Sequence, residues 1–320
     1  MGRMVDGVWQ TDDARAVSSD GQFRRKESAF RDWIEDRPGA RFTPVPGRYH
    51  LYASLACPWA HRTLIFRALK GLEAMIGVTV VHPLMLDQGW GFDAPLVDPL
   101  FGAGHLHEIY ARADPAYTGR VTVPVLWDTL EATIVNNESS EIIRMFNAAF
   151  DGVGAAPGDY YPVQARDRID AINARVYETI NNGVYRCGFA TTQAAYEDAF
   201  DALFDSLDWL DGILSRDRYL LGDQITEADW RLFPTLVRFD PVYHGHFKCN
   251  RNRLMDFPNL WAYTRALYQW PGVMDTVDFT HIKQHYYASH RSLNPTGIVP
   301  KGPLIDFGEP HDRGRPVPPE

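Results

Sequence analysis

The cysteine of Cys57-Pro58-Trp59-Ala60 is the residue of this chain with the clearest chemical potential. Residues 49–52 alternate between two faces as in a strand, whereas Ala60, Leu64 and Ala68 recur at helical spacing. Pro58 suits the first position of a helix, because its φ is fixed near the helical value and its missing N–H would have no partner there. Cys57 is therefore predicted to be the N-cap of a helix.

A thiol at an N-cap lies beside unpaired N–H groups and the positive end of the helix dipole, both of which favour the thiolate. Such a setting brings the pKa of a cysteine from about 8.5 toward roughly 3.5 to 7.5. The alternative is an inert buried thiol, since free cysteine is among the most buried residue types. We favour the reactive thiolate, because a core cysteine is more common inside a strand or helix than between them.

The length and composition are those of a globular protein with about two domains. Of the 320 residues, 45% are hydrophobic and 23% are charged, and the formal net charge is −9. This negative charge argues against nucleic acid or an anionic membrane as the main partner. Local basic residues can still bind a small anion.

The three cysteines, Cys57, Cys187 and Cys249, are far apart and form neither a disulfide framework nor a zinc knuckle. We therefore expect no metal and a reducing compartment. No apolar run approaches the roughly 20 residues that span a bilayer, and the first 21 residues lack the apolar core of a secretory signal. A cytoplasmic protein is expected.

The first half of the chain predicts a sheet with helices between its strands. A second strand is expected at residues 76–84, parallel to the first, and a long structureless insertion at 87–118 is expected to be functional. The segment 121–128 contains Pro124, which marks an edge, a bulge or a strand start, and its bond to Val123 is a candidate for the cis form. A fourth strand near 133–135 is followed by a helix that begins around Ser139. In this thioredoxin-like order, Cys57 and Pro124 meet at one end of the sheet.

The second half of the chain is predicted to be helical. Apolar stripes such as Leu203, Leu207, Leu210 and Leu214 form its core, and Thr226 with Asp229 forms a capping box. A further helix is expected to begin at Pro258. The fold class is thus an α/β thioredoxin-like domain followed by an all-α domain. The expected parts are an N-terminal extension (1–46), the thioredoxin-like domain (47–152), a linker (153–158), the helical domain (159–290) and an extended tail (291–320).

Several segments of the sequence resemble one protein family. LACPWAHR, QGWGF, TGRVTVPVLWD, NNESSEIIRMFN, LGDQITEADWRLFPTLVRFDPVYHGHFKCN and IKQHYYASH, spread between about Gly7 and His290, are similar to the glutathionyl-hydroquinone reductases. These enzymes are the Xi class of the glutathione transferases. The resemblance implies the glutathione transferase fold, glutathione as co-substrate, a homodimer and the removal of glutathione from glutathionyl-hydroquinones.

The resemblance also implies roles for individual residues. Cys57 corresponds to the catalytic nucleophile. The glutathione contacts carried over are Trp90, Arg120, Val123, Glu138 and Ser139, and the tyrosines that line the acceptor pocket are Tyr185, Tyr243 and Tyr286.

The residue types at these positions suit glutathione. The backbone at Val123 can bond the peptide of an extended ligand, as in strand addition. Glu138 can pair with the ammonium group, and Ser139 with the helix N–H groups can hold the γ-glutamyl carboxylate. Arg120 can neutralise a carboxylate, and Trp90 can cover the peptide. Outside these motifs, an ordinary surface arginine and a loop aromatic packed on the core would be the plainer interpretations.

The kind of nucleophile decides the reaction class. A tyrosine or serine would leave glutathione free to attack, whereas a cysteine attacks sulfur and holds glutathione as a mixed disulfide, which a second glutathione resolves. Tyrosine hydroxyls suit the stabilisation of charge on a ring oxygen, although a single helical tyrosine is more often a packing residue.

His61 is interpreted either as a residue that lowers the pKa of the Cys57 thiol or as a surface residue. Cys187 and Cys249 are interpreted as structural.

Two other functions remain open from the sequence. One is an omega-like thiol transferase or dehydroascorbate reductase, which would need no tyrosine-rich pocket. The other is a non-catalytic interaction module on a transferase fold, because a fold does not fix a function. The sequence leaves the physiological hydroquinone open.

Overall fold

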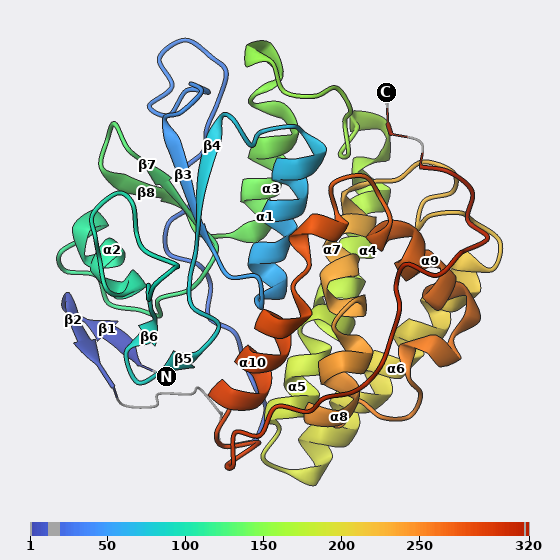
Figure 1. The fold of residues 1–320 in the computed structure, drawn as a ribbon. Coiled ribbons are helices and arrows are strands. Elements are labelled where there is room, and N and C mark those ends of the chain that lie inside the picture. Colours follow the sequence, from blue (N-terminus) through green and yellow to red (C-terminus); the bar gives the residue numbers. More distant parts are fainter. Residues whose placement is uncertain (1, 12–19, 317, 320) are drawn as a thin grey trace. The chain divides into compact units, whose positions relative to one another are not determined.

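The computed structural model describes residues 2–11, 20–316 and 318–319 (Figure 1). The remaining positions of the predicted N-terminal extension and tail lie outside the described residues. The described chain forms two compact units. Residues 2–11, 26–157 and 276–285 form the α/β unit, and residues 20–25, 158–275, 286–316 and 318–319 form the helical unit.

The α/β unit contains a four-stranded sheet with the order β4-β3-β7-β8. β3 pairs parallel with β4 and antiparallel with β7, and β8 pairs antiparallel with β7. The carboxyl ends of β3 and β8 and the amino end of β7 therefore share one edge of the sheet. The strands are β3 (Tyr49–Ala53), β4 (Ile76–Val80), β7 (Val125–Asp128) and β8 (Thr133–Asn136).

Helices cover both faces of this sheet. α1 (Pro58–Leu69) and α3 (Ser139–Ala148) pack against each other on one side, and α2 (Leu106–Ala113) lies on the other (Figure 1). All five residues of β3 are buried, as expected for a central strand covered on both faces. The predicted succession of the four sheet strands along the chain and the parallel pairing of the first two are confirmed.

Two predictions about this unit need correction. The second strand ends at Val80 and not near residue 84. The 87–118 insertion is not structureless, because it contains α2. This helix has only eight residues, but it begins with a capping box between His105 and Glu108 and buries Leu106, Ile109 and Tyr110. The short hairpin of β5 (Met85–Leu86) and β6 (Gly89–Trp90) precedes it.

The N-terminal extension adds backbone pairing to the α/β unit. β1 (Arg3–Val5) and β2 (Val8–Gln10) form a hairpin, and Met4 exchanges two backbone hydrogen bonds with Gly119. Further along, Asp32 N–H donates to the carbonyl of Val135, which extends the sheet beyond β8. An exposed strand edge is thereby covered.

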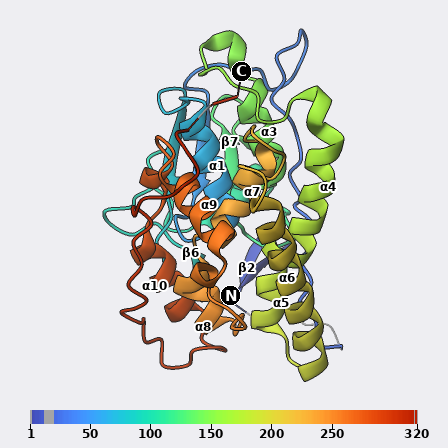
Figure 2. The same ribbon diagram turned by 90° about the vertical axis from the view of Figure 1, so that its right-hand side faces the viewer.

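The helical unit is built from α4 to α9 and the end of α10. Figure 2 shows α5 and α6 side by side. As predicted, Thr226 and Asp229 form the capping box of α7, and Pro258 is the first residue of α9. Its helices are α4 (Arg166–Val176), α5 (Gly183–Phe189), α6 (Gln193–Leu214), α7 (Glu227–Leu236), α8 (His244–His246), α9 (Pro258–Tyr268) and α10 (Phe279–Ser289), with two π-helical turns, η3 (Tyr177–Asn181) and η4 (Phe239–Tyr243). Short 3₁₀ turns lie at Val163–Ala165, Leu254–Asp256 and Met274–Thr276, and a further one, Asp151–Val153, belongs to the α/β unit.

The described part of the tail, residues 291–316, has neither helix nor strand. It is nonetheless anchored: Phe307 is 3% exposed and packs on the rings of Trp261 and Tyr268, at centroid distances of 5.2 and 5.4 Å. Arg313 donates to the carbonyl of Asp217 at 2.8 Å. Across the described ranges, the helices are all too short or too polar to cross a membrane.

Candidate functional site

Cys57 occupies the N-cap of α1, as predicted. Its backbone is extended (φ −77°, ψ 121°), and its carbonyl accepts the first helical hydrogen bond from His61 N–H at 3.0 Å. The side chain makes no capping bond; its Sγ lies 3.7 Å from the carbonyl oxygen of Val123. Cys57 is half-buried, whereas Cys187 and Cys249 are buried, and none of these three described cysteines forms a disulfide.

The loop that faces Cys57 is held by one buried hydroxyl. The Val123–Pro124 bond is cis. Tyr110, which is fully buried in α2, donates its hydroxyl to the carbonyl of Thr122 at 2.9 Å and accepts a bond from Asn137 Nδ2 at 3.0 Å. Burial raises the pKa of Tyr110, so this phenol stays neutral and keeps its proton for bonding. Tyr110 therefore fixes the loop before β7 relative to the start of α3.

Glu138 is the N-cap of α3, and Ser139 is the first helical residue. One carboxylate oxygen of Glu138 accepts bonds from the N–H and hydroxyl of Ser140, at 3.1 and 2.9 Å. The other accepts the hydroxyl of Ser28 at 3.0 Å. Burial opposes ionisation, but these bonds and the nearby charge of Arg62 outweigh it and hold the pKa of Glu138 below its ordinary value. Glu138 is thus a fixed negative charge at neutral pH.

Sequence reasoning did not single out Arg62, Ser28, Tyr110 or Asn137. Arg62 is 2% exposed, and its guanidinium carbon lies 4.6 Å from the centre of the Trp59 ring. The signal for Arg62 was present, since it closes the LACPWAHR motif one turn after Pro58. The other three carry no local signal, because they act through contacts between distant segments.

Trp90 is the last residue of β6 and is 5% exposed. Its ring stacks on His285, with centroids 4.8 Å apart and planes 20° apart, and His285 Nδ1 lies 3.0 Å from the carbonyl oxygen of Pro83. One face of the indole is therefore covered by protein.

Arg120 follows the backbone pairing of Gly119 with Met4 and is half-buried. The hydroxyl of Tyr117 donates to the carbonyl of Arg120 at 2.8 Å. A Cβ on Gly119 would lie 2.5 Å from that hydroxyl, which explains the glycine at this position.

His61 is fully buried rather than on the surface, and its Nε2 lies 2.8 Å from Thr276 Oγ1.

The three predicted tyrosines meet in the helical unit. The hydroxyls of Tyr185 and Tyr286 are 2.6 Å apart, and those of Tyr286 and Tyr243 are 2.9 Å apart. Tyr243 and Tyr286 are buried, while Tyr185 is half-buried. Burial raises the pKa of Tyr243 and Tyr286 well above its ordinary value, so both are neutral phenols. We name this row of hydroxyls the tyrosine triad.

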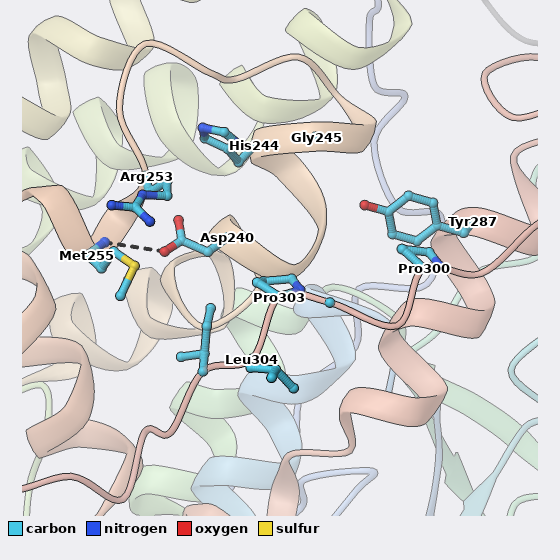
Figure 3. A pocket seen from close by; sticks show the side chains of 11 residues that line it. Asp240, His244, Gly245, Arg253, Met255, Tyr287, Pro300, Pro303 and Leu304 are labelled. Atoms are coloured by element: carbon cyan, nitrogen blue, oxygen red, sulfur yellow. Dashed lines mark hydrogen bonds between the residues drawn. The ribbon is translucent and has the colours of Figure 1, made fainter.

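A cavity of about 410 Å³ in the helical unit lies apart from the triad residues. It is lined by Asp240, Arg253 and Met255, by Tyr287, and by tail residues between 300 and 305 (Figure 3). The carboxylate of Asp240 accepts the backbone N–H groups of Leu254 and Met255, as the dashed line in Figure 3 shows for Met255. Among the described residues, the half-buried Asp240 is the one carboxylate that lines the cavity, and the backbone already engages it; none of the predicted site residues lines the cavity.

In the part of the chain that the structure describes, no group of three or more His, Cys, Asp or Glu side chains is arranged to hold a metal ion. The α/β unit instead brings Cys57 to Val123 and ties the Val123 loop to the residues just before Glu138 and Ser139. A thiol, an ionised carboxylate and the backbone at Val123 on one sheet edge suit a zwitterionic peptide ligand.

Comparison with known proteins agrees with this arrangement. Residues 56–149 match the family model of the glutathione S-transferase N-terminal domain, and residues 193–266 match that of the C-terminal domain. These two matches and the sheet-plus-helices architecture define a protein of the glutathione transferase fold, the fold class that the sequence predicts.

Individual relatives narrow the class. The chain is 58% identical to the glutathionyl-hydroquinone reductase PcpF of Sphingobium chlorophenolicum, over 95% of this chain and 96% of PcpF. It is 50% identical to the glutathione S-transferase omega-like 2 of Schizosaccharomyces pombe, over 90% and 95% of the two chains. A glutathione-bound structure of YqjG from Escherichia coli K-12 matches with a TM-score of 0.90 and 51% identity, over 98% and 99%. The chain belongs to the glutathionyl-hydroquinone reductases, the Xi class of glutathione transferases, and is an enzyme of that family.

Glu138→Gln should change how stability depends on pH. A lowered pKa in the folded state means that the ionised Glu138 stabilises the fold above the ordinary glutamate pKa of about 4.3, and that this contribution is lost as the pH falls through the folded-state pKa. Glutamine keeps the acceptor oxygen but lacks the charge. The variant should be less stable than the unchanged protein at pH 7, and the gap should shrink as the pH falls below the ordinary glutamate pKa, as measured by urea unfolding over a series of pH values. Glu73→Gln, at an exposed position, is the matched control; an equal stability gap for Glu138→Gln across the pH series would contradict the assignment.

Proposed function

We propose that this enzyme reduces glutathionyl-hydroquinones to hydroquinones, with glutathione as co-substrate and Cys57 as the nucleophile. The observation that carries the proposal is the half-buried thiol at the N-cap of α1, which lies against the carbonyl of Val123. The positive end of the α1 helix dipole favours negative charge at this position. The similarity to PcpF supports the choice of substrate class.

In this proposal, the α/β unit binds the glutathionyl part. The backbone at Val123 pairs with the cysteinyl peptide, and Glu138 receives the ammonium group. Although Glu138 already accepts bonds from Ser140 and Ser28, each carboxylate oxygen has two lone pairs, so the group can accept further donors. Ser139 with the N-terminus of α3 holds the γ-glutamyl carboxylate.

Arg120 and Trp90 complete the proposed glutathione contacts. Arg120 neutralises a second carboxylate of the tripeptide. Because one face of Trp90 is stacked on His285 and the residue is 5% exposed, only a small edge of the indole is available to contact the peptide. The stack also fixes the orientation of the ring, which lowers the entropy cost of binding.

The proposed reaction has two displacement steps. The ring carbon that bears sulfur first takes a proton while a ring hydroxyl loses one, so that this carbon is no longer aromatic. The Cys57 thiolate then attacks the glutathionyl sulfur; an S–S bond forms, the bond from sulfur to that carbon breaks, and its electron pair restores the aromatic ring and leaves negative charge on the ring oxygen. Protonation of that oxygen yields the hydroquinone. A second glutathione thiolate then attacks the glutathionyl sulfur of the mixed disulfide, so that oxidised glutathione leaves and the Cys57 thiolate returns. The expected kinetics are ping-pong.

Carbon is a poor leaving group, so the ring must share its charge with a ring oxygen. The tyrosine triad suits this task, because its hydroxyls are neutral donors and a hydroxyl hydrogen can turn from one acceptor to another. Tyr185, the half-buried member, can direct its proton to a ring oxygen when a substrate binds. We propose that Tyr185, Tyr243 and Tyr286 stabilise the developing negative charge and that one of them supplies the proton to carbon.

Cys57→Ser should abolish the reduction of glutathionyl-hydroquinone, with a loss of at least about 10³-fold in kcat. Intact-protein mass spectrometry without a reductant should find one glutathione adduct on the unchanged enzyme after exposure to the substrate, and none on the variant. Cys187→Ala, which removes a buried thiol, should keep both activity and adduct. If the unchanged enzyme formed no adduct on Cys57, both the mixed-disulfide mechanism and a thiol transferase would be excluded.

A second candidate function is an omega-like thiol transferase, which the name of the Schizosaccharomyces pombe relative favours. The two functions differ in their need for the triad. A small mixed disulfide has sulfur as its leaving atom and gains little from phenolic donors. A glutathionyl-hydroquinone, in contrast, depends on them.

Tyr286→Phe should therefore lower kcat for glutathionyl-hydroquinone by about 10²-fold, the usual effect of losing one donor to a developing oxyanion. Tyr286 is the informative position because it bonds to both other hydroxyls. Turnover of a small glutathione mixed disulfide should change by less than about threefold. Tyr196→Phe, which removes a hydroxyl bonded to the carbonyl of Lys248, is the control. Equal losses on the two substrates would favour the thiol transferase.

We also propose a homodimer and a cytoplasmic location. The dimer is supported by the family resemblance, and the location by three cysteines without a disulfide. Sedimentation velocity should give about twice the chain mass of 36.4 kDa. A sedimentation mass equal to one chain would contradict the dimer.

A further inference from the structure

Residues 20–25 of the N-terminal extension pack on the helical unit beside the tyrosine triad. The carbonyl of Gly21 accepts a bond from Thr191 N–H at 3.1 Å, and the carbonyl of Asp20 accepts one from the Thr192 hydroxyl at 3.3 Å. Gly21 has φ +80°, and a Cβ there would lie 2.7 Å from the Thr192 side chain. We call residues 20–25 the entry segment; its path against the start of α6 is fixed by backbone bonds and by this glycine.

The entry segment places an aromatic ring and a positive charge on Tyr185. The Phe23 ring stacks on Tyr185 and packs on Phe189, with centroids 6.2 and 5.6 Å apart. The guanidinium carbon of Arg25 lies 5.3 Å from the centre of the Tyr185 ring, and Arg25 Nε donates to Asn182 Oδ1 at 3.2 Å. The charge is thus held over the ring, in the range of a cation–π contact.

A positive charge over a phenol ring has a defined electrostatic effect. It withdraws electron density from the ring and makes the hydroxyl a stronger donor toward a negatively charged oxygen. Tyr185 is the half-buried member of the triad and therefore the one that a ligand can reach. A second guanidinium, that of the buried Arg238, acts in the same direction, because its charge opposes the effect of burial on the pKa of Tyr243 and Tyr286.

We propose that Arg25 is a specificity-determining residue that favours aromatic substrates whose ring hydroxyl is ionised. This inference rests on the proposed function, since it assigns the triad to the ring oxygen. A ring with electron-withdrawing substituents has a more acidic hydroxyl and carries more negative charge on oxygen at neutral pH. Arg25 therefore attracts the charged ring oxygen of such a substrate as soon as the substrate binds. An unsubstituted ring gains this attraction only as negative charge develops on its oxygen during the reaction. Arg25 works through Tyr185 and Phe23 and is not itself a reacting group.

The experiment compares Arg25→Gln with the unchanged enzyme on two substrates, glutathionyl-hydroquinone and its ring-chlorinated counterpart. The ratio of their kcat/KM values removes effects common to both. In the Arg25→Gln variant, the preference for the chlorinated substrate should fall by about three- to tenfold, the range expected for one charge on an aromatic ring. Arg25→Lys keeps the charge and should retain most of the preference. Arg24→Gln removes an adjacent exposed charge that pairs with Asp20 and should change nothing.

A purely structural Arg25 would give a different result. Arg25→Gln would then lower kcat/KM for both substrates by the same factor, or lower the melting temperature alone, and an unchanged ratio would overturn the proposal. A binding measurement separates this failure from a failure of the proposed function. Titration calorimetry with a trichlorophenolate and with neutral phenol should show a preference for the anion that Arg25→Gln reduces by a similar factor. This difference should appear whether or not the unchanged enzyme turns over glutathionyl-hydroquinone; equal preferences in both proteins would refute the role of Arg25.

Discussion

The pairing of β3 with a parallel neighbour on one side and an antiparallel neighbour on the other is the constraint on which the candidate site depends. Parallel pairing with β4 requires a crossover helix, and that helix begins directly after Cys57. Antiparallel pairing with β7 brings the residues before β7, including Val123, to the edge where β3 ends. Because β8 runs antiparallel to β7, Glu138 leaves the sheet at that same edge. Three segments that are far apart in sequence therefore supply a thiol, a backbone edge and a carboxylate to one place.

Backbone pairing brings these segments together, but side-chain hydrogen bonds set their chemistry. The Tyr110 hydroxyl joins the carbonyl of Thr122 to the amide of Asn137, so the loop and the helix start cannot move independently without leaving buried polar groups unpaired. The bonds to Glu138 keep it ionised although it is partly buried. A ligand with an ammonium group thus meets a carboxylate that is already charged and oriented, and less binding energy is spent on ordering the protein.

The features that local patterns encode could be predicted from the sequence, and those made by long-range contacts could not. The N-cap position of Cys57, the capping box at Thr226 and the start of a helix at Pro258 each depend on residues within one turn, and all three are confirmed. The helix α2 has apolar residues at helical spacing, Leu106, Ile109 and Tyr110, but it is only two turns long and lies in a segment rich in glycine and proline, which hid this pattern. The β1–β2 hairpin has a local signal that sequence reasoning missed, because Asp6-Gly7, both with positive φ, form a two-residue turn between apolar residues. The entry segment has no such pattern, and its path comes from bonds to Thr191 and Thr192, about 170 residues away. The family resemblance pointed to the three tyrosines, but only the structure shows that the hydroxyl of Tyr286 bonds to those of Tyr185 and Tyr243.

The cysteine and the tyrosine triad meet two different requirements of the proposed reaction: a nucleophile that attacks sulfur, and hydrogen-bond donors for the ring oxygen. A helix N-terminus stabilises any anion, so the electrostatics around Cys57 would suit the glutathione thiolate of a conjugating transferase equally well. The residue type decides the outcome, because sulfur attacks sulfur and leaves the ring carbon as the departing atom. That carbon departs only if its charge reaches a ring oxygen, and neutral phenols are suitable partners for such an oxygen because they keep their protons until the charge appears. Burial of Tyr243 and Tyr286 secures this neutrality. Because Tyr185 is the half-buried member of the triad, the two buried tyrosines act on the ring oxygen through the hydrogen bonds that link their hydroxyls to that of Tyr185.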